Sequence, residues 1–216
     1  MSKISVILVA GGRGTRMKNP VAKQFLLLKD KPIARYSFDI FRTIPDVFEV
    51  IVVCDPEYRH LFPACKFADS GKERQDSVWN GLEQVSPQAD LVAVHDSARP
   101  FITRQLVLDL IEQASLHKAV ASAVRVKATI KQASPDGTVV QTLDRSNLWE
   151  MHTPQITTPQ LLREGLIRAR SQNITVTDDA AAIELLGHPV KLIPGSYQNI
   201  KITTPEDLAI AQSFLS

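Results

Sequence analysis

The sequence predicts an α/β protein with a Rossmann-like, doubly wound, mostly parallel sheet and a projecting β-hairpin arm. Short β-branched apolar runs alternate with amphipathic segments, which is the order that builds such a sheet. Most of these runs lack polar alternation, as expected of strands covered on both faces. The rhythm breaks once, at about residues 125–155, where a hairpin pattern appears. With 216 residues and no long linker or internal repeat, the chain fits a single domain.

Short apolar runs mark the predicted strands. The first run reads ISVILV and leads directly into a glycine-rich turn. The others are of similar length, and most are equally rich in β-branched residues, which favour strands. The predicted strands cover residues 4–9, 50–54, 91–95, 119–124, 190–193 and 199–202.

Amphipathic spacing marks the predicted helices between these strands. In one of them Thr103 can serve as N-cap, and apolar residues from Leu106 to Ala114 recur at helical spacing. The last helix begins with TPED, which supplies a cap, a proline in the first turn and two acids near the positive helix end. The predicted helices cover residues 33–43, 76–85, 103–117, 158–171, 178–186 and 204–214.

The break in rhythm predicts a hairpin. Residues 126–132 and 138–143 read as two strands, and the SPDG segment at 134–137 reads as their turn. A hairpin that projects from a sheet has few partners for its own edges. One interpretation is therefore an arm that packs against a second subunit, which predicts a homodimer. The other is an edge hairpin that folds onto its own domain.

Composition narrows the function classes. The net charge of +2 predicts no broad basic face for nucleic acid or for an anionic membrane. Cys54 and Cys65 show neither metal-ligand spacing nor a disulfide framework, which favours a reducing compartment. No apolar run approaches membrane-spanning length, and no signal peptide is visible. We expect a cytoplasmic protein.

A glycine-rich segment, AGGRGTRM at residues 10–17, follows the first strand. Glycines let backbone N–H groups approach a phosphate without a Cβ in the way. Met17 stands where a dinucleotide fingerprint needs glycine, and the Gly-Lys-Ser/Thr of a P-loop is absent from the sequence. Arg16 and Lys23 add positive charge, which suits a triphosphate that is being cleaved. The alternative is a tight strand-to-helix turn with solvated arginines.

Three further clusters fit the same chemistry. The segment at residues 71–77 precedes a predicted helix, where it could hold a base or a phosphate, or simply cap the helix. Asp96 follows a buried strand, at the ligand-facing edge of an open α/β sheet, and could bind Mg²⁺ or only contact Arg99. Lys201 lies at a predicted strand, where a lone lysine is ordinarily solvated. No serine or cysteine has a credible base partner, so nothing favours covalent catalysis.

Taken in order along the chain, these clusters resemble the 2-C-methyl-D-erythritol 4-phosphate cytidylyltransferase family of the non-mevalonate isoprenoid pathway. The likeness runs over nearly the full length. It is carried by residues 10–17 with Lys23-Gln24, 71–78, 95–100, Asp144-Arg145 with Leu148-Trp149, 153–155, 176–178, 199–203 and 205–208.

The resemblance implies a single nucleotidyltransferase domain over residues 1–216, with an arm at about 125–155 for dimerisation and substrate binding. It implies that CTP and 2-C-methyl-D-erythritol 4-phosphate give 4-diphosphocytidyl-2-C-methyl-D-erythritol and pyrophosphate, with Mg²⁺ as cofactor.

The resemblance also implies site residues, carried over by position. The implied catalytic residues are Arg16, Lys23 and Lys201. The implied CTP-binding residues are Ala10, Gly11, Gly12, Gly14, Gly71, Arg74, Ser77, Asp96 and Ser97. The implied acceptor-binding residues are Arg145, Thr153 and Lys201, of which the first two reach into the partner subunit's site. Asp96 is the candidate metal residue, directly or through water.

The sequence departs from the family pattern at three positions. Ala22 stands where the family commonly has proline, Ser70 where it has glycine, and Ser97 where it has alanine. Ser70 could alter the base pocket, so cytosine preference is less firmly implied than nucleotidyl transfer. Two alternatives stay open: transfer of CMP to ribitol 5-phosphate, and a nucleotide-binding regulator without turnover.

Overall fold

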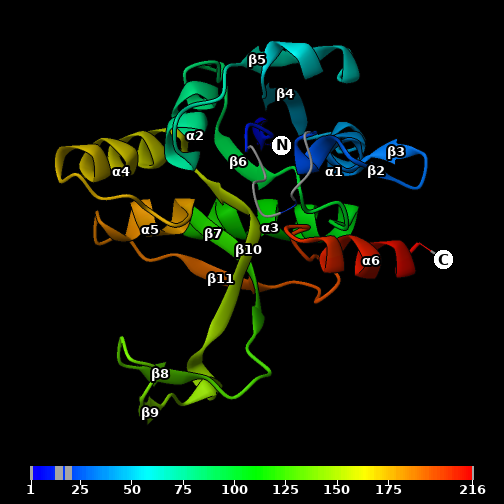
Figure 1. The fold of residues 1–216 in the computed structure, drawn as a ribbon. Helices are drawn as coiled ribbons and strands as arrows, with labels where there is room; N and C mark the ends of the chain where they lie inside the picture. The colour runs from blue at the N-terminus through cyan, green and yellow to red at the C-terminus, as the bar shows by residue number, and fades with distance from the viewer. Residues whose placement is uncertain (1, 13–16, 18–20, 216) are drawn as a thin grey trace.

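The computed structural model describes residues 2–12, 17 and 21–215 and has the predicted α/β class. Seven strands form one sheet in the order β11-β7-β10-β6-β1-β4-β5 (Figure 1). Its strands are β1 (Ile4–Val9), β4 (Val47–Val53), β5 (Lys66–Ala68), β6 (Leu91–Asp96), β7 (Ala119–Arg125), β10 (Trp149–Thr157) and β11 (Lys191–Pro194). The central pairs β4-β1 and β1-β6 are parallel, as expected of a doubly wound sheet, and the β1-β4 register shifts once, between Ile4 and Ser5.

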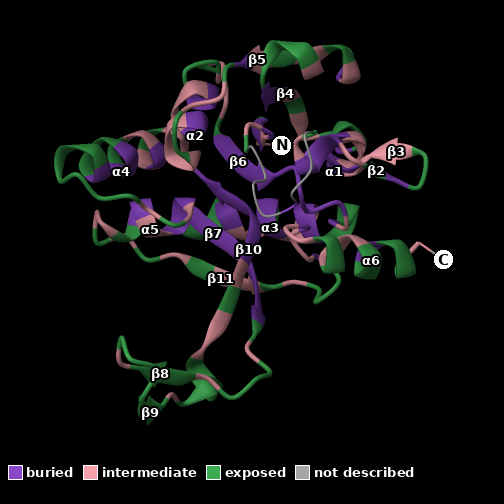
Figure 2. Ribbon diagram, viewed as in Figure 1, coloured by how far each residue is buried: buried purple, intermediate pink, exposed green. Residues whose placement is uncertain are grey.

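Helices cover both faces of this sheet. On one face, Phe38 and Phe41 of α1 (Ile33–Arg42) and Leu110 of α3 (Arg104–His117) pack against Val6 and Leu8. On the other face, α2 (Arg74–Leu82), α4 (Pro159–Ser171) and α5 (Asp179–Glu184) pack against Ile7 and Ile51. Alternate residues of β1 therefore enter two separate cores, which explains the unbroken apolar run in its sequence. Figure 2 shows this burial concentrated in the centre of the sheet.

The predicted helix caps are confirmed. Thr103 Oγ1 accepts a hydrogen bond from the Leu106 N–H at 3.1 Å, and α3 begins at the next residue. At α6 (Pro205–Ser213), Thr204 and Asp207 form a reciprocal capping box. The short elements were not predicted; they are η2 (Lys23–Phe25), β2 (Leu27–Leu28), β3 (Lys31–Pro32), η3 (Pro56–Leu61), the edge strand β5 (Lys66–Ala68) and η4 (Arg145–Asn147).

Strand β10 was not predicted, and it is the antiparallel member of the sheet. It pairs antiparallel with β6 on one side and with β7 on the other. Its sequence, WEMHTPQIT, contains a proline and few β-branched residues, so the local pattern argues against a central strand. The Thr153–Pro154 peptide is cis, and the register with β7 shifts between Met151 and Gln155. This irregular stretch accommodates the proline.

The predicted strand at residues 199–202 is wrong. The segment is an irregular connection before α6, tied to the loop after β6 by the Ile202 N–H, which donates to the Ala98 carbonyl at 2.9 Å. Arg99 donates to the Asn199 carbonyl at 2.7 Å. A side chain therefore satisfies a backbone group that a neighbouring strand would otherwise pair.

The predicted hairpin is confirmed as β8 (Lys131–Ala133) and β9 (Val139–Thr142), joined by a turn with Gly137 at φ +85°. It projects away from the sheet as an arm (Figure 1), and every residue of its two strands is exposed (Figure 2). These observations disfavour the alternative in which the hairpin folds onto its own domain.

Among the residues described, no helix is both long enough and apolar enough to cross a membrane.

Candidate active site

A cavity of about 800 Å³ lies at the carboxyl ends of β1, β4 and β6. This is the edge where ligands bind in open α/β sheets. The cavity brings together residues from four segments: Gly11 and Gly12 after β1 (called the glycine turn below), the loop before α2, the end of β6 and the segment before α6. The lining residues are Val9, Gly11, Gly12, Lys23, Gln24, Asp55, Ser70, Gly71, Lys72, Glu73, Arg74, Ser77, Asp96, Ser97, Ala98, Lys201 and Thr203.

The glycine turn forms one wall. A Cβ on Gly11 would lie 2.3 Å from Ser70 Oγ, so the close approach of these two segments requires glycine here. The buried Gln24 amide donates to the carbonyls of Ala10 and Gly12 at 2.6 and 3.0 Å, and so fixes the backbone on either side of Gly11. This role of Gln24 was not predicted, although its position beside Lys23 could have suggested it. Gly14 and Arg16 lie outside the described residues.

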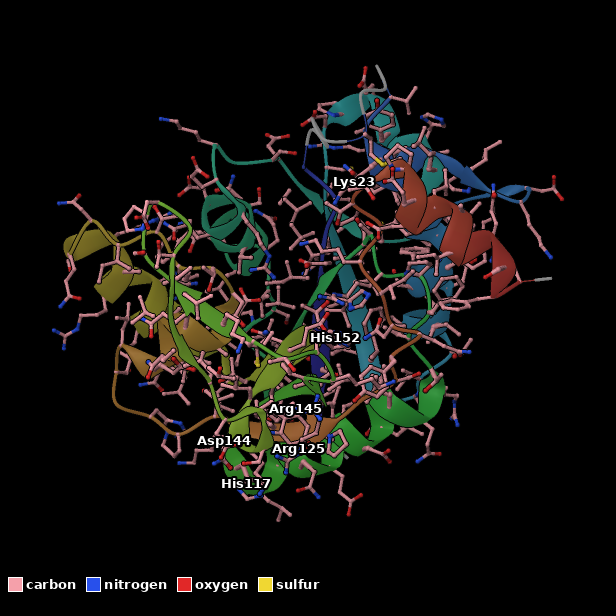
Figure 3. All side chains as sticks on the ribbon, turned by 60° about the horizontal axis from the view of Figure 1, so that its bottom comes forward. Lys23, His117, Arg125, Asp144, Arg145 and His152 are labelled. Atoms are coloured by element: carbon pink, nitrogen blue, oxygen red, sulfur yellow. The ribbon has the colours of Figure 1, made fainter. Side chains whose placement is uncertain are left out.

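Two predicted catalytic lysines reach this cavity from opposite ends of the chain. Lys23 is in η2, where the neighbouring Phe25 ring stacks on Tyr58 with centroids 3.7 Å apart. Lys23 is only 8% exposed, yet it lines the cavity (labelled in Figure 3). Lys201 enters from the segment before α6. The structure therefore brings these two lysines to one cavity beside Gly11 and Gly12, and their catalytic roles remain predictions.

Asp96 lies between two cations at the end of β6. Its Oδ1 accepts from Arg74 Nε at 3.0 Å, and its Oδ2 accepts from Lys201 Nζ at 2.7 Å. Burial alone would raise the pKa of Asp96, but the charges of Arg74 and Lys201 outweigh it and hold that pKa far below its usual value. The alternative contact with the Arg99 side chain is not the one formed, because that guanidinium donates to the Asn199 and Met151 carbonyls.

The loop before α2 lines the cavity next to the glycine turn. The Gly71 N–H donates to Ser77 Oγ at 2.9 Å. A Cβ on Gly71 would lie 2.3 Å from Asp76 Cβ and 2.7 Å from the Ser77 nitrogen, so glycine is needed here as well. Glu73 is the N-cap of α2, and Asp76, in the first turn, accepts from the Glu73 N–H at 3.1 Å to complete a capping box. The loop thus both caps α2 and lines the cavity, and its binding of a base or a phosphate remains a prediction.

Arg74 also pairs with a residue that the sequence did not single out. Its Nη1 and Nη2 donate to the two oxygens of Asp179, at 3.0 and 2.8 Å. Asp179 is 2% exposed and opens α5, far along the chain from Arg74. All three of the Arg74 atoms Nε, Nη1 and Nη2 donate to carboxylates in the structure. The predicted contact of Arg74 with CTP remains a prediction.

Thr153 lies next to Asp96 within its own chain. The Asp96 N–H donates to Thr153 Oγ1 at 3.0 Å, and Oγ1 is 3.0 Å from His95 Nδ1. Because His95 Nε2 is 3.1 Å from the Arg99 carbonyl, it must carry the proton, and Nδ1 then accepts from the Thr153 hydroxyl. Thr153 is buried and supports Asp96 from behind. Its predicted acceptor contact remains a prediction.

Arg145 lies apart from this cavity. It is exposed in η4, near the base of the arm, and donates to the Lys127 carbonyl. In Figure 3 it lies beside Asp144 and Arg125, well away from Lys23. Within one chain, therefore, the structure does not bring Arg145 to the site of the two lysines.

His95 makes stability depend on pH. Burial lowers the pKa of His95 from 6.5 to about 4. Between these values the unfolded chain binds a proton at this position and the folded chain does not, so the free energy of unfolding decreases as the pH falls. We expect a decrease of about 3 kcal/mol that levels off once the pH is below the folded-state pKa.

Urea unfolding of the wild type, His95→Gln and His117→Gln across this pH range measures the effect. His95→Gln is expected to lose part of the pH dependence, whereas His117→Gln, changed at an exposed position at the end of α3, should keep it. Parallel curves for wild type and His95→Gln would contradict the assignment.

Comparisons with a family profile and with individual relatives all point to one family. Residues 4–216 match the sequence profile of the family described as 2-C-methyl-D-erythritol 4-phosphate cytidylyltransferase. A relative of that name from Chlamydia pneumoniae is 45% identical over 100% of both chains. A chloroplastic relative from Oryza sativa is 46% identical over 99% of this chain and 74% of its own.

Solved structures with the same description share the fold. The enzyme from Francisella tularensis superposes with a TM-score of 0.85 at 31% identity, covering 98% of this chain and 99% of its own. The enzyme from Thermus thermophilus gives 0.82 at 31% identity, covering 99% of this chain and 98% of its own.

Proposed function

Because this chain belongs to the 2-C-methyl-D-erythritol 4-phosphate cytidylyltransferase family, we propose that its cavity carries out the reaction for which the family is named. CMP is transferred from CTP to 2-C-methyl-D-erythritol 4-phosphate, giving 4-diphosphocytidyl-2-C-methyl-D-erythritol and pyrophosphate. One observation carries the proposal: Lys23 and Lys201 line a single cavity together with the turn at Gly11 and Gly12.

The residues suit this displacement. An oxygen of the acceptor phosphate forms a bond to the α-phosphorus of CTP, and the bond from that phosphorus to the bridging oxygen of pyrophosphate breaks. A phosphate monoester is mostly a dianion at neutral pH, since its second pKa is about 6, so no general base is required. What the protein must supply is positive charge and orientation, and Lys23, Lys201 and the N–H groups of the glycine turn are suited to both.

Mg²⁺ is part of the proposal, and the donor set limits how it is held. Both oxygens of Asp96 already bond to cations, and the described residues contain no group of three acidic, histidine or cysteine side chains placed for a metal. A site with so few protein ligands is still suitable for Mg²⁺, because this ion commonly keeps several water ligands and binds phosphate oxygens of the substrate. We therefore propose that CTP brings the ion, with Asp96 as its nearest protein carboxylate, and that the ion neutralises charge on the triphosphate.

We further propose a homodimer in which the arm reaches the partner's site. The support is the exposure of β8 and β9, and in particular of Val139 and Val140, which are 56% and 62% exposed. Apolar side chains on an isolated two-stranded arm favour a protein partner over water. In this arrangement Arg145 would contact the acceptor bound by the other subunit. The cytoplasm remains our prediction for the location.

Pyrophosphate release tests the proposed function. Purified protein with CTP and Mg²⁺ is incubated with 2-C-methyl-D-erythritol 4-phosphate, with ribitol 5-phosphate, or with neither. We expect release with the first acceptor, little with the second, and none when EDTA removes the metal. Release only with ribitol 5-phosphate would identify a ribitol-5-phosphate cytidylyltransferase. If neither acceptor leads to pyrophosphate release, the protein is better explained as a nucleotide-binding regulator.

A further inference from the structure

Four charged side chains form a ladder that ends at the proposed reaction centre. Asp179 pairs with Arg74, Arg74 pairs with Asp96, and Asp96 pairs with Lys201. The negative and positive groups alternate, and they come from α5, α2, the end of β6 and the segment before α6. Asp179 is at the buried end, with its side chain 3% exposed, and Lys201 is at the open end, with its side chain 37% exposed.

Arg74 divides its donors unevenly between the two carboxylates. Nη1 and Nη2 both go to Asp179, which is the bidentate geometry of a guanidinium on an ionised carboxylate. Only Nε goes to Asp96, through Oδ1. The second oxygen of Asp96 is thereby left for Lys201 Nζ at 2.7 Å.

We infer that Asp179 is a positioning residue for the proposed reaction. By occupying two donors of Arg74, it keeps Arg74 from binding Asp96 in bidentate fashion, and so keeps Lys201 on Asp96 Oδ2. Asp179 does not touch substrate in this arrangement, since it acts through Arg74 and Asp96. The inference rests on the proposed function for its catalytic consequence but not for its structural one.

The physical basis is competition between two cations for one carboxylate. If Asp179 loses its charge, Arg74 is attracted to the remaining anion, Asp96, where two parallel N–H···O bonds are stronger than one. Lys201 Nζ then loses its partner at Oδ2. A lysine released in this way is no longer held where charge develops, and a displacement of about 1 Å at a reacting group can cost up to 10²-fold in rate.

The test measures how fast Lys201 reacts with an amine-directed acylating reagent, read by peptide mass spectrometry without substrate. In Asp179→Asn, which keeps the side-chain shape, we expect Lys201 to react several-fold faster than in the wild type. In Arg74→Gln the competing cation is gone and Asp96 pairs with Lys201 alone, so we expect Lys201 to react more slowly. The two variants should therefore move the rate in opposite directions.

Lys66 is the internal control in each sample. It pairs with Glu49 at 2.6 Å on β5, outside the ladder, and its reaction rate should not change. Faster reaction of Lys201 in both variants would mean simple loosening of the fold and would overturn the inference. An unchanged Lys201 rate in Asp179→Asn would overturn it as well. If Asp179→Asn fails to fold, Arg74→Gln still tests whether Arg74 competes with Lys201 for Asp96, and a Lys201 rate that is not slower in Arg74→Gln would overturn the inference.

Kinetics provide the second readout. We expect Asp179→Asn to lower kcat by roughly 10- to 100-fold with a smaller change in the KM for CTP. In a Lys201→Ala background the same substitution should have much less effect, because the residue through which it acts is missing. Equal factors in both backgrounds would contradict the inference. Absence of turnover in the wild type would reject the proposed function and leave the labelling result to stand alone.

Discussion

Replacing Lys23 with alanine is expected to lower kcat by about 10²–10³-fold, the usual scale for loss of one group that stabilises charge in the transition state. Lys23 lines the cavity beside the glycine turn while remaining 8% exposed, so its charge acts in a site with little water to screen it. The KM for CTP should change less than kcat, because the charge on the α-phosphate and pyrophosphate oxygens grows only as the bond breaks. Steady-state pyrophosphate release measures both constants.

Lys31→Ala is the matched control for this prediction. Lys31 carries the same charge but pairs with Asp39 of α1 at 2.9 Å, on the surface. Its removal should leave kcat within a small factor of the wild type. Near-normal turnover in Lys23→Ala, with the melting temperature unchanged, would remove Lys23 from the mechanism.

Replacing Arg145 with alanine is expected to lower kcat/KM for the acceptor by roughly 10- to 100-fold, the scale of one lost hydrogen bond to a charged group. The reason is the proposed dimer, in which Arg145 on the arm of one subunit contacts the acceptor phosphate in the site of the other. The KM for CTP should be little affected, since the glycine turn and the loop before α2 are intact. Kinetics with each substrate varied in turn will show the difference.

Mixed dimers provide a sharper form of this test. A dimer of one Lys23→Ala chain and one Arg145→Ala chain has one site with both defects and one site with neither, if Arg145 serves the partner's site. Random assembly from equal amounts of the two chains should therefore restore about a quarter of the wild-type activity, well above either variant alone. Arg125→Ala in place of Arg145→Ala is a control on the same arm.

Failure of complementation would mean that Arg145 serves its own chain or acts only on the fold. A monomer in light scattering, at the concentrations used for kinetics, would reject the arm as a dimer contact altogether. In that case the exposed Val139 and Val140 would need another explanation.

Local sequence pattern predicted most of the elements. The alternation of apolar runs with amphipathic segments located β1, β6, β7 and the six helices to within a few residues, because burial on both faces of a sheet requires unbroken apolar runs. Three predictions for the sheet were wrong: strands β5 and β10 were missed, and residues 199–202 do not form a strand. Strand β10 carries a proline and polar residues, and residues 199–202 look strand-like but bond through a side chain instead.

The sequence also located residues that line the cavity. Glycines at 11 and 71 are required by contacts of 2.3 Å that any Cβ would make, and the two lysines stand beside recognisable motifs. Gly14 and Arg16 lie outside the described residues, so their roles stay predictions. The sequence did not reveal the partners of these charged side chains. Asp179 follows Asp178 at the start of α5, and two acids at a helix start look like ordinary capping residues.

By itself, then, the sequence determined the class of fold, the edge of the sheet where the cavity lies, and the family to which the chain belongs. These follow from local rules: the period of apolar residues, the freedom of glycine, and the charge of a few side chains. Only the tertiary structure decided which carboxylate holds which cation. Arg74, Asp96, Asp179 and Lys201 meet because four separate elements end at one place, and pairing across such distances in the chain leaves no local pattern to read.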